Sequence, residues 1–291
     1  MKIYTLVICF IFISFYQCFA QASNEYIGAI KLNDTSVITY RIKFKAHRGI
    51  IDGFSITDFG GEHETKSIIK GTYDAHKKVI AFNETQIVYT KSPVSQNDFC
   101  NVYFMPTAFK LGKTKYFTGK FKGKFSDGTE CINGEIFLNS VENVNKRIAK
   151  VSKKVKKSKK INDTIKDKLN TLKILDKVNL NVLKKNQVTS VFTNSEKVTL
   201  YIYDGGKLDG DRITIKNGNN VILSKYKITQ HKKSIVLSLT SKKTTLTILS
   251  ESIGTIGSNT AVIEYVDNAQ TIKTLTNLQK GETTQIDILR R

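Results

Sequence analysis

The sequence predicts a mainly β protein with three parts: an N-terminal antiparallel β-barrel or meander, a basic linker helix and a C-terminal β-sandwich. Two observations indicate the β regions. Apolar and polar residues alternate over short runs, and Gly, Asn and Asp turn residues separate those runs. The third observation is a change of period after residue 140, where apolar residues recur at gaps of three and four. We therefore expect β domains at residues 22–140 and 188–291, with a basic helical linker at residues 141–187.

The first twenty residues have the composition of a secretory signal peptide. They contain one lysine, a long apolar core without charge and a small residue at the end, so we predict cleavage after Ala20. No second apolar run approaches the roughly 20 residues that a membrane-spanning helix needs. The mature chain is therefore predicted to lack an integral membrane span and to be secreted, periplasmic or at the cell surface.

Removal of this signal peptide would leave two cysteines, Cys100 and Cys131. An even number of cysteines in an oxidising compartment favours a disulfide, and the alternative is a pair of free buried thiols. Both cysteines lie in runs with the composition of strands, so a link between neighbouring strands or loops is expected. We predict a structural disulfide rather than a redox centre.

Residues 22–140 show strand signals throughout. Tyr40, Ile42 and Phe44 share one face of a predicted strand, whereas the residues between them are polar. Glycine recurs on the apolar face of several predicted strands, at positions Gly28, Gly71, Gly119, Gly123 and Gly134. Because glycine weakens an isolated strand, this placement predicts strongly curved strands that approach one another closely. We expect a barrel or coiled meander of about eight strands, which is either solid or holds one small ligand.

The tripeptide Glu62-His63-Glu64 is the densest group of potential metal ligands in the first domain. It follows Gly60-Gly61, and no second histidine stands at a spacing typical of a metal site. We therefore interpret this segment as a solvated polar turn.

Residues 141–176 are predicted to form the helix and are the most basic part of a chain with a formal net charge of +21. The apolar positions are Val141, Val144, Ile148, Val151, Val155, Ile165, Leu169 and Leu172. This apolar seam is interrupted between Ser158 and Asn162, where lysines are densest. The interruption argues against one long coiled coil.

The lysines of this helix are predicted to bind an anionic surface or polymer. The predicted contact residues are Lys150, Lys153, Lys154, Lys156, Lys157, Lys159 and Lys160. Two alternatives remain open: a charged spacer between the domains, and a homodimer formed through the apolar seam. Specific nucleic-acid binding is not expected, because no aromatic residue is interleaved with the lysines to stack on a base.

Alternating runs return in residues 188–291, with turn signals every ten residues or so, of which Asn217-Gly218 is the clearest. About eight short strands in roughly a hundred residues predict a β-sandwich of immunoglobulin-like or jelly-roll type.

Three aspartates near one turn, Asp204, Asp209 and Asp211, form a tentative calcium site. Carboxylate oxygens with intervening glycines suit a hard cation. The favoured alternative is that these aspartates shape turns by accepting backbone N–H bonds, in which case the protein has no cofactor.

Several stretches carry a resemblance. They are Tyr203-Asp204-Gly205, residues 209–213 (DGDRI), Asn217-Gly218 and residues 256–263 (IGSNTAVI), together with residues 64–67 (ETKS), 69–74 (IKGTYD) and 120–125 (KFKGKF) up to Cys131. In these stretches the chain resembles uncharacterised secreted two-domain β-rich proteins of Bacteroidetes. The resemblance implies an extracellular or cell-envelope setting, but it implies no activity. Where copies in that group often carry tryptophan beside the first Asp-Gly, this chain has Tyr203.

An enzyme is not expected, because the chain lacks a Gly-x-Ser-x-Gly elbow, a His-Glu-x-x-His motif and a phosphate-binding glycine loop. We expect instead a non-enzymatic secreted or cell-envelope protein that binds a glycan, a lipid headgroup or another anionic envelope component. The alternative is a structural or assembly protein that uses the helix as a spacer or as a dimer seam.

Overall fold

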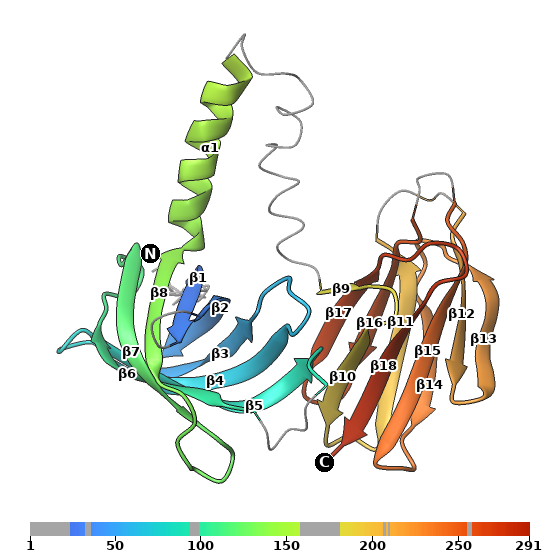
Figure 1. Ribbon diagram of the computed structural model, residues 1–291, viewed down its shortest axis with the longest axis horizontal. Helices are drawn as coiled ribbons and strands as arrows, with labels where there is room; N and C mark the ends of the chain where they lie inside the picture. The colour runs from blue at the N-terminus through green and yellow to red at the C-terminus, as the bar shows by residue number, and fades with distance from the viewer. Residues whose placement is uncertain are drawn as a thin grey trace, which may run out of the picture.

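The computed structural model describes residues 24–32, 36–93, 99–157, 181–205, 208, 210–254 and 258–291. These residues form an N-terminal barrel, a second pair of packed sheets and one helix (Figure 1). The predicted mainly β fold class is therefore confirmed. The predicted signal peptide, residues 1–20, lies outside the described residues. Within the described ranges, no helix is both long enough and apolar enough to cross a membrane.

The first eight strands close into an up-and-down antiparallel barrel. They are β1 (Asn24–Leu32), β2 (Ser36–His47), β3 (Ile50–Thr57), β4 (Thr65–Asp74), β5 (Val79–Thr90), β6 (Asn101–Ala108), β7 (Tyr116–Lys124) and β8 (Gly134–Ser140). Each strand pairs with the next along the chain, and β8 pairs with β1 to complete the closure. The predicted barrel of about eight strands is confirmed.

Aromatic side chains fill one end of the barrel. Phe109, which follows β6, is only 2% exposed. Its ring lies between 5.3 and 6.1 Å from the rings of Tyr26, Phe44, Tyr73 and Phe117. Such edge-to-face and tilted ring pairs stabilise a core beyond the area that they bury. The barrel is therefore solid at this end.

Two glycines illustrate why the barrel strands need residues without a side chain. A Cβ atom added at Gly28 would overlap the carbonyl oxygen of Phe137 on the neighbouring strand. One added at Gly71 would overlap the carbonyl oxygen of Ala81 in the same way. The close backbone approach predicted from the glycine pattern is therefore confirmed.

Cys100 and Cys131 form the predicted disulfide, with a Cα–Cα distance of 6.1 Å. The bond links the segment before β6 to the segment between β7 and β8. It therefore ties together two connections at the same end of the barrel, opposite the end that Phe109 closes.

The helix α1 (Val141–Lys157) follows β8 without a break and projects away from the barrel (Figure 1). The Ser140 hydroxyl accepts a hydrogen bond of 3.2 Å from the backbone N–H of Asn143, which caps the helix N-terminus. The predicted start of the basic helix is thus confirmed. Residues 158–180, which include the predicted positions Ile165, Leu169 and Leu172, lie outside the described residues.

The second domain is a sandwich of two sheets. Its strands are β9 (Asn181–Leu183), β10 (Val188–Thr193), β11 (Lys197–Asp204), β12 (Arg212–Asn217), β13 (Asn220–Lys227), β14 (Lys233–Ser238), β15 (Lys243–Ser252), β16 (Ala261–Val266), β17 (Thr271–Thr276) and β18 (Thr283–Arg290). One sheet has the order β13-β12-β15-β18-β10 and the other has the order β14-β11-β16-β17-β9. Ile215 and Ile248 of the first sheet belong to the same buried core as Leu200 and Ile263 of the second. The predicted sandwich is confirmed.

One boundary differs from the sequence prediction. Residues 181–187 were predicted to lie in the helical linker, but β9 pairs in parallel with β17 as the edge strand of a sandwich sheet. The prediction is wrong for this segment because a strand of three residues is too short to show a clear alternation of apolar and polar residues.

The barrel and the sandwich also share backbone hydrogen bonds. Ser190 and Val191 of β10 pair with Thr90 and Tyr89 at the end of β5. The side chains of Val88 and Tyr89 belong to the buried core of the sandwich. The two domains are therefore joined by a continuous sheet as well as by the linker.

Candidate functional site

The end of the barrel opposite Phe109 contains a pocket of about 440 Å³. The up-and-down strand order brings the starts of β2, β4 and β6 together with the end of β3 at this mouth. The polar residues of its lining include Thr57, Asp58, His63, Thr65, Ser67, Glu84 and Asn101, and the apolar residues include Ile38, Ile87 and Phe99. A concave site with apolar walls and a few convergent polar groups is the usual form of a small-ligand site.

Glu84 is the most unusual residue of this pocket, because its carboxylate is buried and only 4% of the residue is exposed. Its Oε1 accepts hydrogen bonds from the Tyr40 hydroxyl (3.0 Å) and the Ser55 hydroxyl (2.6 Å). Its Oε2 accepts a hydrogen bond of 2.8 Å from the backbone N–H of Val102. Three barrel strands thus hold the carboxylate in one orientation.

Burial raises the pKa of the Glu84 carboxyl, although the three hydrogen bonds act in the opposite direction. No lysine or arginine forms an ion pair with Glu84 in the part of the chain that the structure describes. An ionised carboxylate without a cation is costly to bury. Its ionised form therefore destabilises the fold above its raised pKa, unless a bound group complements the charge.

Tyr40 stays a hydrogen-bond donor to the buried Glu84 carboxylate. Burial and the neighbouring Glu84 raise its pKa well above the ordinary value for tyrosine. Tyr40 therefore remains protonated at neutral pH and continues to orient the carboxylate of Glu84.

The charge of the pocket contrasts with that of the whole chain. Its described lining contains two carboxylates, Asp58 and Glu84, and the imidazole of His63, but neither lysine nor arginine. The complete sequence carries a formal net charge of +21. The pocket is therefore better suited to hydroxyl or ammonium groups than to an anion.

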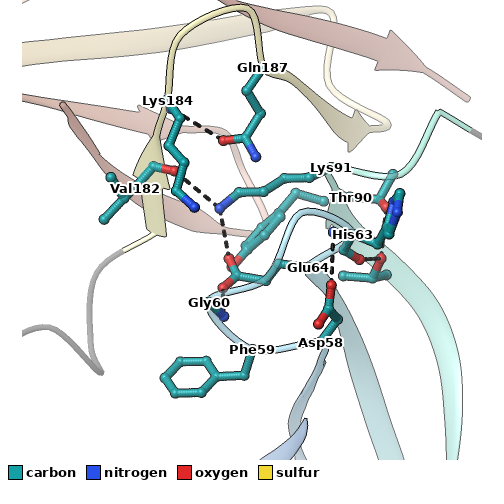
Figure 2. A network of polar contacts seen from close by, with 12 residues as sticks. Asp58, Phe59, Gly60, His63, Glu64, Thr90, Lys91, Val182, Lys184 and Gln187 are labelled. Carbon is teal, nitrogen blue, oxygen red and sulfur yellow. Dashed lines mark hydrogen bonds and ion pairs between the residues drawn. The ribbon is translucent and has the colours of Figure 1, made fainter. Parts of the chain in front are cut away.

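Residues 58–64 connect β3 to β4. Asp58 and His63 of this connection line the pocket, whereas Glu64 contacts Lys91 near the sandwich (Figure 2). On the pocket side, the Asp58 carboxylate accepts a hydrogen bond of 2.9 Å from the backbone N–H of His63. On the other side, Glu64 forms an ion pair with Lys91 at 3.3 Å and accepts a hydrogen bond of 2.9 Å from the Tyr89 hydroxyl. Lys91 also donates to the Val182 carbonyl, 3.2 Å away, in the sandwich domain.

This network corrects the interpretation of Glu62-His63-Glu64 as a solvated turn. Glu62 and His63 are exposed as expected, but Glu64 is only 2% exposed. The prediction is wrong for Glu64 because its partners are distant in the sequence: Tyr89 lies near the end of β5 and Lys91 follows that strand.

The predicted lysine site lies on α1. Its residues Lys150, Lys153, Lys154, Lys156 and Lys157 are exposed, and none forms an ion pair with a carboxylate in the described ranges. Lys159 and Lys160 lie outside those ranges. Since α1 begins where β8 ends, these lysines and the pocket are at opposite ends of the barrel.

The tentative calcium site stays a prediction. Asp204 and Asp211 are both buried, and Asp209 lies outside the described residues. The Asp211 carboxylate accepts a hydrogen bond of 2.8 Å from the backbone N–H of Thr260, as expected if it shapes a loop. Among the residues that the structure describes, no three carboxylate, histidine or cysteine side chains are grouped to hold a metal ion.

Sequence reasoning missed Glu84, although a signal was present. Every second residue at the start of β5 faces the barrel interior, namely Ile80, Phe82 and Glu84. The alternation therefore predicts that the Glu84 side chain also points inward. A charged residue at such a position indicates either a satisfied polar contact or a ligand site.

Comparison of the chain with protein-family models, with curated proteins and with solved structures found no match. The function of the pocket is therefore inferred from its geometry and chemistry.

Proposed function

We propose that the protein is a non-enzymatic secreted or cell-envelope protein that binds a saccharide unit at the mouth of its barrel. The observation that carries this proposal is Glu84, a buried carboxylate without a cationic partner among the described residues, in a pocket of about 440 Å³. Sugar hydroxyls donate hydrogen bonds, and such a carboxylate can accept them.

The remaining lining supports the same ligand class. Ser67 and Asn101 carry groups that both donate and accept hydrogen bonds, as a ring of hydroxyls requires. Phe99 and Ile87 provide apolar contacts for the C–H face of a sugar, in a chain that contains no tryptophan. The absence of lysine and arginine from the described lining favours a neutral or cationic saccharide over an acidic one.

The lysines of α1 have a separate role in this proposal. They hold the protein at an anionic surface or polymer of the cell envelope through long-range electrostatic attraction. Because α1 leaves the barrel at the end opposite the pocket, contact through its lysines leaves the mouth accessible.

The saccharide proposal is tested by titrating the full chain with glucose, N-acetylglucosamine, glucosamine and glucuronate in ligand-observed NMR. We expect the neutral or cationic sugars to bind and glucuronate to bind more weakly, because its carboxylate meets Asp58 and Glu84. Glu84→Gln should lower the affinity about tenfold, since it removes a charged acceptor. The rim variant Asn101→Ala should weaken binding without disturbing the barrel core.

Asp52→Asn is the matched control, because it removes an exposed carboxylate from β3 outside the pocket. The proposal is wrong if none of the sugars binds, if glucuronate binds most tightly, or if the control lowers the affinity as much as Glu84→Gln.

Replacing Lys153, Lys154, Lys156 and Lys157 of α1 with glutamine is expected to abolish most binding to vesicles that contain phosphatidylglycerol. Each lysine near an anionic membrane contributes about 1 kcal/mol, and salt screens that attraction. Co-sedimentation at low and high ionic strength measures the effect. The matched control makes the same change of charge in the sandwich, by replacing four exposed lysines with glutamine: Lys216, Lys227, Lys233 and Lys242.

Equal losses of vesicle binding in the two lysine variants would contradict a specific role for α1. The alternative of a structural protein predicts instead a homodimer that persists in high salt, because the seam of α1 leaves Val151 54% exposed. Sedimentation at two salt concentrations separates these possibilities.

A further inference from the structure

A second, smaller cleft of about 250 Å³ lies where the outer face of the barrel meets the sandwich. Strands β2, β3 and β4 supply its barrel wall, and β9 and β17 supply its sandwich wall. Ligand sites occur preferentially at such junctions between domains. The charged residues of its described lining are Arg41, Lys43, Glu64, Lys66 and Lys273.

The positive charge of this cleft is only partly compensated. Arg41 donates a hydrogen bond of 2.7 Å to Glu25, which also lies 3.6 Å from the Lys43 ammonium. Glu64 is already paired with Lys91. The two remaining lysines, Lys66 and Lys273, form no ion pair in the described part of the chain. The charge of Lys273 nevertheless acts on Glu264 of the neighbouring strand, and its ammonium lies 6.0 Å from the centre of the Tyr203 ring.

Lys66 is a half-buried cation of the cleft. Its ammonium lies 4.2 Å from the centre of the Phe54 ring, in a half-buried position. Burial, followed by repulsion from the Arg41 guanidinium, lowers the pKa of Lys66 below the ordinary value for lysine. A bound anion would remove this electrostatic cost.

Asn181 supplies an independent sign of a missing ligand. This residue of β9 lines the cleft and is only 7% exposed. Neither its Nδ2 nor its Oδ1 atom has a hydrogen-bond partner within the described structure. Buried side-chain amides almost always have partners, because an unsatisfied polar group destabilises the fold. Asn181 thus places an unsatisfied donor group and an unsatisfied acceptor in the wall of the cleft.

From these contacts we propose that the junction cleft binds a phosphate group, as inorganic phosphate or as a phosphate monoester. Lys66 and Lys273 neutralise the phosphate oxygens, and the Asn181 amide donates to one of them. The Asn181 carbonyl oxygen accepts a hydrogen bond from a P–OH group. Sulfate has no such proton at neutral pH, whereas a phosphate group, whose second pKa is about 6, is still partly protonated. The carboxamide binds this protonated form and so selects phosphate over sulfate. This site is separate from the saccharide pocket and does not depend on it.

Isothermal titration calorimetry of the full chain with inorganic phosphate, glycerol 3-phosphate and sulfate tests this inference. We expect at least one phosphate compound to bind and sulfate to bind about tenfold more weakly. Lys66→Gln and, from the opposite wall, Lys273→Gln should each weaken phosphate binding about tenfold. Asn181→Leu should remove the preference for phosphate over sulfate. Tighter binding of glycerol 3-phosphate than of inorganic phosphate would identify an esterified ligand, and the reverse order would identify free phosphate.

Lys45→Gln is the matched control, because Lys45 lies on the same face of β2 as Lys43 but outside the cleft. The inference is overturned if neither phosphate compound binds, if sulfate binds as tightly as phosphate, or if Lys45→Gln has the same effect as Lys66→Gln. Loss of saccharide binding has no bearing on these outcomes, since the two pockets share no lining residue.

Discussion

Glu64→Leu is expected to lower the free energy of unfolding by about 3–5 kcal/mol, the usual cost of breaking a buried ion pair. The side chains of Glu64 and Lys91 are each only 3% exposed, so the substitution leaves the lysine charge buried without its partner. The Tyr89 hydroxyl and the Gly60 backbone N–H also lose their acceptor. Urea denaturation followed by circular dichroism measures the loss.

The double variant Glu64→Leu/Lys91→Met separates this cause from a general disturbance of the junction. Replacing a whole buried ion pair with apolar side chains is often close to neutral. We therefore expect the double variant to regain most of the lost stability, apart from about 1 kcal/mol for the hydrogen bond from Lys91 to the Val182 carbonyl. A double variant no more stable than Glu64→Leu would show that the uncompensated charge of Lys91 is not the cause.

The second large effect is expected at the disulfide. Replacing Cys100 and Cys131 with serine should lower the free energy of unfolding by about 3–4 kcal/mol, because the bond closes a loop of 31 residues in the unfolded chain. Since Cys100 also lines the barrel mouth, its loss should weaken saccharide binding as well. Urea denaturation and the NMR titration measure the two effects.

The wild-type chain unfolded in the presence of a reducing agent is the control for the cysteine variant. Both should show the same loss of stability relative to the oxidised protein. A variant as stable as the oxidised chain would mean that the disulfide does not restrict the unfolded state. A loss seen only in the variant would point to the serine side chains themselves.

Part of the barrel could be predicted from short-range patterns. Alternation in segments such as β2 and β4 depends on residues two positions apart, so it is visible without knowledge of any partner strand. The glycines at positions 28 and 71 gave a further signal, because they stand where the alternation calls for a large apolar residue. The start of α1 was recognisable from the change in period.

The candidate sites were much harder to predict. Glu84 is held by Tyr40 and Ser55, which are 44 and 29 positions away in the chain. Lys91 contacts the Val182 carbonyl across 91 positions. Asn181 belongs to a three-residue strand whose partner, β17, follows some ninety residues later. No local pattern contains such pairings.

The β class, the curvature of the barrel strands and the basic helix follow from the order of residues alone, because each depends on side chains a few positions apart. The barrel mouth, the buried pair of Glu64 and Lys91, and the junction cleft depended on the tertiary structure. Closure of the barrel and its pairing with β10 bring groups from distant strands within hydrogen-bonding distance and remove them from water. Without water, electrostatic interactions are stronger and an unsatisfied polar group costs more free energy. Binding a complementary ligand can then be favourable at these positions.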